Sequence, residues 1–179
     1  MTPEQLAALG RIAEAAAGAE RATGCPAEIS AAQCIVESAW LHVAPGNNCF
    51  GIKATDDHCQ YCLTKEYLNG EWTSQKLAFA TYPTLTACFA AHARLLQSGV
   101  YAPAWRKYQG DHDLDTYIRG IAEHYATDPG YAPKILQLAH GPHVSVAILK
   151  ARQRAADKSE IVLEEGSQSP VSRSYRRQL

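Results

Sequence analysis

Glu37 is the residue whose surroundings best suit acid–base chemistry. It lies in an otherwise apolar helical stretch beside Val36 and Trp40, at the margin of the predicted buried face. Burial beside apolar groups raises the pKa of a carboxyl group, which allows it to hold a proton near neutral pH and to act as the general acid in glycosidic-bond hydrolysis. The alternative interpretation is a solvated or capping glutamate, the more common use of a helical Glu.

The loop after Glu37 carries groups that suit the binding of a sugar. Asn47 and Asn48 can hydrogen-bond acetamido and hydroxyl groups, and the ring of Phe50 can pack against a sugar. Gly51 suits a tight backbone, and Lys53 completes the segment. We therefore expect this loop to form the floor of a cleft, although core packing is an equally good explanation of Phe50.

Three aromatic residues elsewhere are candidate platforms for a sugar ring. They are Trp72, Trp105 and Tyr131. The planar face of each can stack on a sugar, whereas packing within the protein is the more common use of such side chains.

A group of cysteines and a histidine raises the alternative of a zinc site. His58, Cys59 and Cys62, with Cys49 nearby in sequence, could form a zinc knuckle. A second Cys-x-x-Cys pair, which a complete knuckle would show, is missing. Apart from this alternative we expect no metal and no cofactor.

The thiols allow other interpretations. Disulfides that pin the hairpin are an equal alternative to the zinc site if the protein reaches an oxidising compartment, and six cysteines leave their pairing open. Buried free thiols are the simplest interpretation of Cys34 and Cys88. A cysteine peptidase built on Cys34 or Cys49 with His92 is conceivable, but no local signature supports it.

Helical periodicity predicts the elements that position Glu37. Apolar residues at helical spacing predict an amphipathic helix over residues 3–22, which Gly24 ends. Pro26 suits the first turn of a second helix, which carries Glu37.

Further helices follow in the second half of the chain. Thr84 and Asp113 are the expected N-caps of a third and a fourth helix, and Gly99 is expected to end the third. A short helix over residues 131–140 and a weaker one over residues 144–157 complete the set.

A hairpin lies between the second and third helices. Two β-prone segments, residues 60–68 and 71–82, are joined by an Asn-Gly dipeptide, which accepts the positive φ angles of a type I′ turn. The register of such a turn pairs Glu66 with Thr73 and places Glu66 near the tip. The elements together predict a mainly α protein of the α+β class, with a helical lobe and a small β-hairpin lobe.

Composition limits the domain count and the class of partner. With 179 residues, 46% hydrophobic and 20% charged, the chain is expected to form one ordered domain over residues 1–157 and a flexible tail over residues 158–179. The net charge of -1 argues against nucleic-acid binding, and no apolar run is long enough for stable membrane insertion. We expect a monomer.

Five motifs in a fixed order resemble a known family. They are AAQCIVESAW, NNCFGIKA, TKEYLNGEW, FATYPTLTACFAAHARLL and YATDPGYAPKIL. Their succession resembles the bacterial glucosaminidase family of peptidoglycan hydrolases. The resemblance implies a lysozyme-like helical lobe with a small β lobe. It also implies an endo-β-N-acetylglucosaminidase that cleaves the β-1,4 bond after N-acetylglucosamine in cell-wall glycan.

The resemblance also implies roles for three residues. Glu37 matches the general acid, Glu66 matches a second acidic residue suited to activating water, and Tyr125 matches an aromatic residue that lines the cleft. Where the family commonly has Gly-Trp-Gly after Glu-Ser, residues 39–41 are Ala-Trp-Leu, so the following loop is expected to take another path.

The mechanism and two alternative functions stay open. Carboxyl groups about 5–5.5 Å apart indicate retention, about 6.5–9.5 Å indicates inversion, and the substrate's own acetamido group can replace the second carboxylate. A lytic transglycosylase would leave anhydro-muramic ends instead of adding water. A catalytically silent peptidoglycan-binding or assembly module would leave the strand unchanged.

The implied partner, the glycan strand of bacterial peptidoglycan, lies outside the cytoplasm. The N-terminal residues lack the basic start and uninterrupted apolar stretch of a signal peptide. We therefore expect release as a phage endolysin through a holin pore, or export by a dedicated secretion system, with action in the periplasm or outside the cell.

Overall fold

Seven α-helices, two short 3-10 helices and one two-stranded sheet make up the described part of the chain. The computed structural model describes residues 1–68 and 71–167, and within them the side chains of all residues except 64–68, 72 and 159–167. The elements are α1 Pro3–Thr23, α2 Ala27–Glu37, η1 Pro45–Asn47, β1 Cys59–Leu68, β2 Glu71–Ala80, α3 Leu85–Leu96, η2 Gly99–Tyr101, α4 Ala102–Asp111, α5 Leu114–Tyr125, α6 Tyr131–Ala139 and α7 Pro142–Ser167. The predicted class, mainly α with a small β-hairpin, is confirmed.

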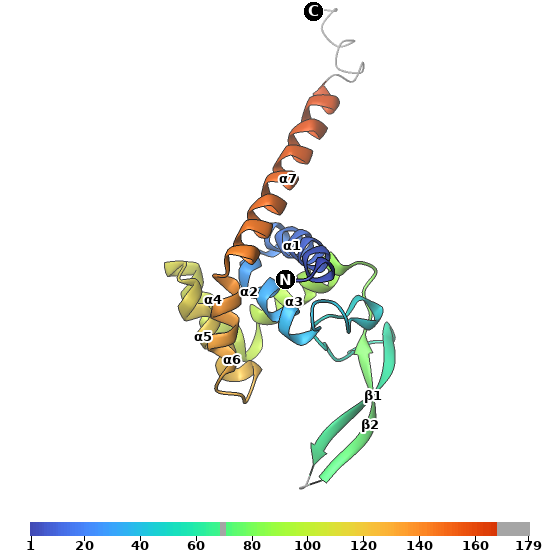
Figure 1. Ribbon diagram of the computed structural model, residues 1–179. Coiled ribbons are helices and arrows are strands. Elements are labelled where there is room, and N and C mark those ends of the chain that lie inside the picture. The colour runs from blue at the N-terminus through green and yellow to red at the C-terminus, as the bar shows by residue number, and fades with distance from the viewer. Residues whose placement is uncertain (69–70, 168–179) are drawn as a thin grey trace, which may run out of the picture.

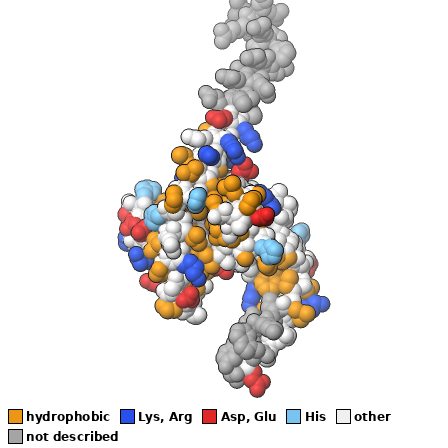
Figure 2. Space-filling view, in the orientation of Figure 1, with side chains coloured by type: hydrophobic (Ala, Val, Ile, Leu, Met, Phe, Trp, Pro, Cys, Tyr) orange, Lys and Arg blue, Asp and Glu red, His pale blue; other side chains and the backbone are white. Residues whose placement is uncertain are grey.

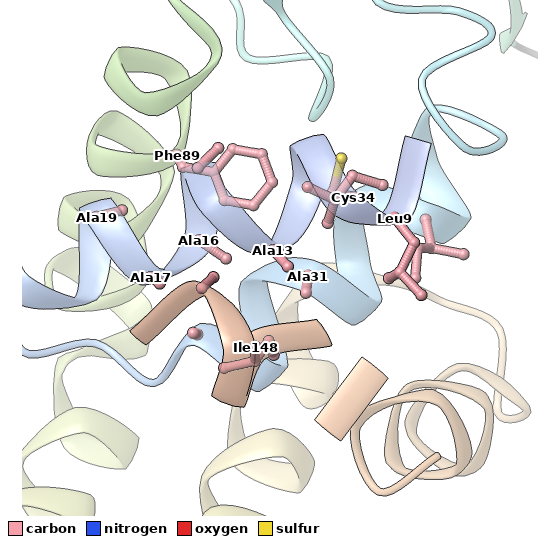
Figure 3. Close-up of a cluster of buried hydrophobic side chains, with 14 of the residues drawn as sticks. Leu9, Ala13, Ala16, Ala17, Ala19, Ala31, Cys34, Phe89 and Ile148 are labelled. Atoms are coloured by element: carbon pink, nitrogen blue, oxygen red, sulfur yellow. The ribbon is translucent and has the colours of Figure 1, made fainter. Parts of the chain in front are cut away.

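The helix α2 lies at the centre of the helical body, where it packs against α1, α3, α6 and α7 (Figure 1). From α1 it meets a row of alanines, whose small side chains allow the neighbouring helices to approach closely. Figure 3 shows Ala13 and Ala16 of this row gathered with Phe89 of α3 and Ile148 of α7. The core therefore holds α2, and with it Glu37, from several sides.

Local signals placed most helix ends correctly. Gly24 ends α1 in the left-handed region with φ 78°, and the side chains of Thr84 and Asp113 accept hydrogen bonds from the first turns of α3 and α5. Gly99 was expected to end α3, but α3 ends at Leu96 and Gly99 begins η2.

The helix α4 was not predicted from the sequence. Pro103 occupies its first turn, where the missing N–H is not needed, and the helix has few aliphatic residues to reveal its period. The side of α4 that faces α5 is aromatic instead, and it is only partly buried. The rings of Trp105 and Tyr108 pack on Tyr117 of α5, with centroids 5.9 and 5.0 Å away.

The hairpin has the predicted register, since Glu66 lies opposite Thr73 and the sheet contains only β1 and β2 among the described residues. The predicted Asn69-Gly70 turn lies outside the described residues. Figure 1 shows the hairpin extending away from the helical body. At its base, Lys53 forms a bridge with Phe79 of β2, which ties the loop after α2 to the sheet.

The last helix is longer than predicted. The expected helix covered residues 144–157, whereas α7 runs from Pro142 to Ser167 and extends from the body on the side opposite the hairpin (Figure 1). Arg152 fastens its buried half by pairing with Glu20 of α1 and Glu28 of α2. Within residues 1–68 and 71–167, no helix combines the length and the apolar character that crossing a membrane requires.

Candidate active site

Glu37 is the last residue of α2, and its carboxylate meets a residue of a distant element. Oε1 of Glu37 accepts a hydrogen bond of 3.0 Å from the hydroxyl of Tyr131, which begins α6. Two segments that are 94 positions apart in sequence therefore converge on one carboxyl group.

Glu37 is one of the residues that line a cleft of about 270 Å³ between the helical body and the hairpin. Val43 and Pro45 line one wall of this cleft, while Gln60 and Phe79 line the wall on the hairpin. Figure 2 shows the helical body and the hairpin lobe with a hollow between them. The cleft is mostly apolar, which suits a group that must keep a proton.

Two effects compete for the pKa of Glu37. Desolvation by burial raises it, and this effect is larger than the lowering by the Tyr131 hydrogen bond and the positive charge of Lys134. The residue as a whole is nevertheless exposed. Its carboxyl group thus lies partly within the protein and is open to the cleft, rather than shut off from solvent, as a proton donor to an external substrate requires.

A column of aromatic rings supports Tyr131. Tyr125 stacks on it with ring centroids 5.6 Å apart and an interplanar angle of 17°. The ring of His92 meets Tyr125 edge-on at 6.1 Å, and Phe50 stacks on His92 at 3.7 Å. Burial raises the pKa values of both tyrosines and lowers the pKa of His92 to about 3, so all three side chains stay neutral.

This column changes the expected use of two aromatic residues. Tyr131 is only 6% exposed and Phe50 is also 6% exposed, so neither offers a broad face to a sugar. Phe50 is a core residue, the alternative that the sequence left open. The hydroxyl of Tyr131 is directed at Glu37 instead of at the cleft.

The two asparagines of the cleft loop are engaged with backbone groups. The amide of Asn47 donates to the carbonyl of Tyr82, at 2.8 Å. Asn48 donates to Ile52 and Ala80, and its Oδ1 accepts from the N–H groups of Phe50 and Ile52. These side chains therefore shape the loop and join it to β2, and the expected direct bonds to sugar groups would have to displace these contacts.

Gly51 and Lys53 lie at the edge of this loop. Gly51 has φ 64°, a conformation that glycine adopts without strain, as the tight backbone required. It lines the cleft, whereas Lys53 is exposed and is not among the lining residues.

Residues 39–41, where the family pattern has glycines, adopt an unusual backbone. Ala39, Trp40 and Leu41 all have positive φ, at 47°, 64° and 64°. The buried hydroxyl of Ser38 holds this turn, since it donates to the carbonyl of Cys34 and accepts from the N–H of Leu41. The turn redirects the chain from Glu37 to the cleft loop, at the cost of strain in non-glycine residues.

Two of the expected residues fall outside the side chains that the structure describes, and a third lies elsewhere. Glu66 is on β1 and Trp72 is on β2, and the side chains of both are outside the described set. Trp105 packs on α5 and is absent from the lining of the cleft.

The zinc alternative is not supported. Cys59 and Cys62 lie on one strand at a spacing of three, which directs their side chains to opposite faces of β1. Within the described part of the chain, no three His, Cys, Asp or Glu side chains form a group that could hold a metal ion.

All six cysteines are free in the structure. Cys34 and Cys88 are fully buried, as expected for thiols in the core. The sulfur atoms of Cys49 and Cys88 lie 3.8 Å apart. His92 is buried against Phe50 and Ser30, which gives no support to a cysteine peptidase.

Sequence reasoning did not assign a role to Gln33. Its side-chain amide donates to the hydroxyl of Tyr131 at 2.9 Å. The available signal was a polar residue on an otherwise buried helix face, one turn before Glu37.

The chain is similar to a known protein family and to curated proteins. A family model described as mannosyl-glycoprotein endo-beta-N-acetylglucosaminidase, or glucosaminidase, matches residues 13–142. Two curated relatives from Lactococcus lactis, both described as probable N-acetylmuramidases, are 33% and 32% identical over 135 residues. The match covers 69% of this chain but only 30% of each relative.

Solved structures share the fold. A peptidoglycan hydrolase mutant from Sphingomonas sp. A1 is 27% identical, with a TM-score of 0.63 over 81% of this chain and 99% of that one. A C-terminally truncated glycoside hydrolase domain of Salmonella typhimurium FlgJ is 26% identical, with a TM-score of 0.61 over 75% of this chain and 95% of that one. The catalytic domain of the Listeria monocytogenes autolysin Auto, 24% identical, shares the fold with a TM-score of 0.71 over 82% and 89%. The expected lysozyme-like arrangement is confirmed.

Proposed function

The chain belongs to the glucosaminidase family, and from this premise we propose that it hydrolyses the glycan strand of bacterial peptidoglycan at the β-1,4 bond after N-acetylglucosamine. The observation that carries the proposal is the carboxyl group of Glu37, which borders the cleft with its pKa raised by burial. Such a group can protonate the glycosidic oxygen as the bond to the anomeric carbon breaks.

Tyr131 supports this role for Glu37. Once Glu37 has given up its proton, the carboxylate bears a negative charge in a partly desolvated position. The hydrogen bond from Tyr131 to Oε1 stabilises that charge. Tyr125, stacked on Tyr131, holds the phenol ring in place. Tyr125 itself is not among the residues that line the described cleft, so its proposed role is to support Tyr131.

Glu66, on strand β1 of the hairpin, is the proposed second acidic residue, with activation of water as its role. The lining of the described cleft contains Glu37 as its one carboxyl group among the described side chains. A route assisted by the substrate's acetamido group would need only Glu37, and the anomeric configuration of the first product distinguishes a retaining or assisted route from an inverting one.

The cleft loop supplies the proposed binding surface. Asn48 and Gly51 line the cleft, and Asn47, Phe50 and Lys53 hold or flank the same loop. We assign to this loop the placement of one sugar of the strand against Glu37, through backbone groups and the shape that the asparagines impose.

Partner and place follow from the same chemistry. The proposed partner is the glycan strand, with neither nucleic acid nor membrane, and the catalytic domain, residues 1–157, is proposed to act as a monomer, with residues 158–179 as a tail. Action in the periplasm or outside the cell would follow release through a holin pore or a dedicated secretion system.

Glu37→Gln, assayed by clearing of purified peptidoglycan, tests the proposal. We expect at least about a hundredfold loss of rate, the scale of general acid catalysis. Glu123→Gln is the matched control, because Glu123 is an exposed residue of α5 that does not line this cleft, and it is expected to keep full activity. Undiminished clearing by Glu37→Gln would refute the assignment.

Mass spectrometry of the digested strands then identifies the bond. New reducing ends on N-acetylglucosamine support the proposed specificity. Reducing ends on N-acetylmuramic acid would instead indicate a muramidase, the activity named for the Lactococcus relatives. Anhydro-muramic ends would indicate a lytic transglycosylase, and bound but uncut strands a silent binding module.

A further inference from the structure

Three side chains form a continuous hydrogen-bonded chain from the core to the cleft. Nε2 of Gln33 lies 2.9 Å from the hydroxyl oxygen of Tyr131, which lies 3.0 Å from Oε1 of Glu37. Gln33 and Glu37 are four residues apart on α2, so both project from the same face and can reach one phenol on α6.

The burial of Gln33 indicates that this contact is its main purpose. The side chain is 0% exposed, and its Oε1 has no hydrogen-bond partner among the described residues. An amide is costly to bury, and more so when one of its polar atoms is unpaired. The polar contact that the structure gives Gln33 is the one with Tyr131.

The chemistry of a phenol fixes the direction of the chain. The oxygen of Tyr131 carries one hydrogen, so when it accepts from Gln33 it directs that hydrogen to Glu37. If the amide were turned the other way, Tyr131 would give its hydrogen to Oε1 of Gln33 and none to Glu37. The donor end of Gln33 therefore makes Tyr131 a donor to Glu37.

We propose that Gln33 is a positioning residue which, through Tyr131, reserves Oε1 of Glu37 as an acceptor and leaves Oε2 as the oxygen that carries the transferable proton. The inference deepens the proposed function and rests on it. In the reaction, the Oε2–H bond breaks and its proton joins the glycosidic oxygen. The electron pair of the breaking bond to the anomeric carbon goes to that oxygen, and the charge left on Glu37 is shared with Oε1, where Tyr131 stabilises it.

Titration of Glu37 tests the chain without any assay of activity. The carboxyl resonances of the free protein are followed by NMR with glutamate labelled at its side-chain carbon. Tyr131→Phe removes a hydrogen bond that lowers the pKa of Glu37, and we expect the pKa to rise by about 1 pH unit. Gln33→Met keeps the length of the side chain and removes the donor that polarises Tyr131. Because one hydrogen bond strengthens the next by about 10–30%, we expect a smaller rise of about 0.1–0.3 unit.

The double variant distinguishes a chain from two independent effects. If Gln33 acts through Tyr131, the variant Gln33→Met/Tyr131→Phe titrates like Tyr131→Phe alone. In the active protein, Gln33→Met is expected to lower kcat about three- to tenfold with KM changed less than about twofold, because the orientation of the acid and not substrate binding is altered.

Ser30→Ala is the matched control, since Ser30 is a buried polar residue one turn before Gln33 that does not contact Tyr131. It is expected to leave the titration of Glu37 unchanged. If Gln33→Met does not fold, Gln33→Asn, which keeps the amide but is one methylene too short to reach, is expected to give the same shift.

An unchanged titration of Glu37 in Gln33→Met or Gln33→Asn would overturn the inference, as would a further shift in the double variant. Failure of the proposed function is recognised separately. It would appear as full activity of Glu37→Gln, whatever the titration of Glu37 in the Gln33 variants.

Discussion

Replacing Arg152 with methionine tests how α7 is fastened to the helical body. The guanidinium group of Arg152 donates to both oxygens of Glu20, at 2.6 and 2.7 Å, and to both oxygens of Glu28, at 2.8 and 3.0 Å. Methionine retains most of the aliphatic stem, so Arg152→Met removes the charge and the donors but keeps much of the packing. It leaves two partly buried carboxylates without their shared cation.

The exposure of the three side chains determines how much stability Arg152→Met is expected to remove. Arg152 is 40% exposed, whereas Glu20 and Glu28 are 23% and 20% exposed. Exposed ion pairs contribute about 0–1 kcal/mol, and removing one partner of a fully buried pair costs about 3–5 kcal/mol. This network lies between those limits, so we expect Arg152→Met to lower the free energy of unfolding by about 2 kcal/mol. For a chain of this length the Tm would fall by about 4–8 °C.

Thermal and urea unfolding measure this loss. Arg154→Met is the matched control, because Arg154 also lies on α7 but pairs with Glu14 where the two side chains are 65% and 60% exposed. That change is expected to cost less than about 0.5 kcal/mol. Since α7 extends away from the side of the hairpin, the activity of the folded Arg152→Met protein should equal that of the native protein (Figure 1). Equal unfolding temperatures for the two variants would refute the reasoning.

Three further predictions concern the site. Ala39→Gly relieves a positive φ of 47° at an exposed position and should raise the free energy of unfolding by about 1 kcal/mol in urea titrations; an unchanged midpoint would contradict the proposed strain. Asn48→Ala leaves partly buried backbone groups of the cleft loop unpaired and should cost about 2–4 kcal/mol on the same assay, with weaker clearing of peptidoglycan. A loss below about 1 kcal/mol would show that water replaces the side chain. Folding raises the pKa of Glu37. The protein is therefore most stable with respect to this group below the pKa that Glu37 has in the unfolded chain, and it loses that stability as the pH rises through the pKa of the folded protein. Over that pH interval, Glu37→Gln should gain stability relative to the native protein. Unfolding measured across pH checks this, and parallel pH curves for the two proteins would contradict it.

Local chemistry explains why much of the fold was predictable. Gly24 and Thr84 act within one turn of their own helices, and the Glu66–Thr73 register follows from the length of one hairpin. The missed helix α4 and the extended α7 had weak local signals. The helix α4 is hard to recognise from sequence, because an aromatic helix face with Pro and Gly has no clear aliphatic period. The packing of Trp105 on Tyr117 in the tertiary structure shows which side of α4 faces inward.

The class of the fold, the helix that carries Glu37 and the apolar character of its surroundings follow from the amino-acid sequence, because helix periodicity, caps and turns depend on residues close together in the chain. The contacts of each candidate side chain depend instead on the packing of distant segments. Asn48 is directed to the backbone of β2, and Tyr131 joins Gln33 to Glu37 across more than 90 positions of sequence. Such contacts depend on how α2, α6 and the hairpin pack together, and no local pattern specifies which of several polar groups a buried hydroxyl or amide will meet.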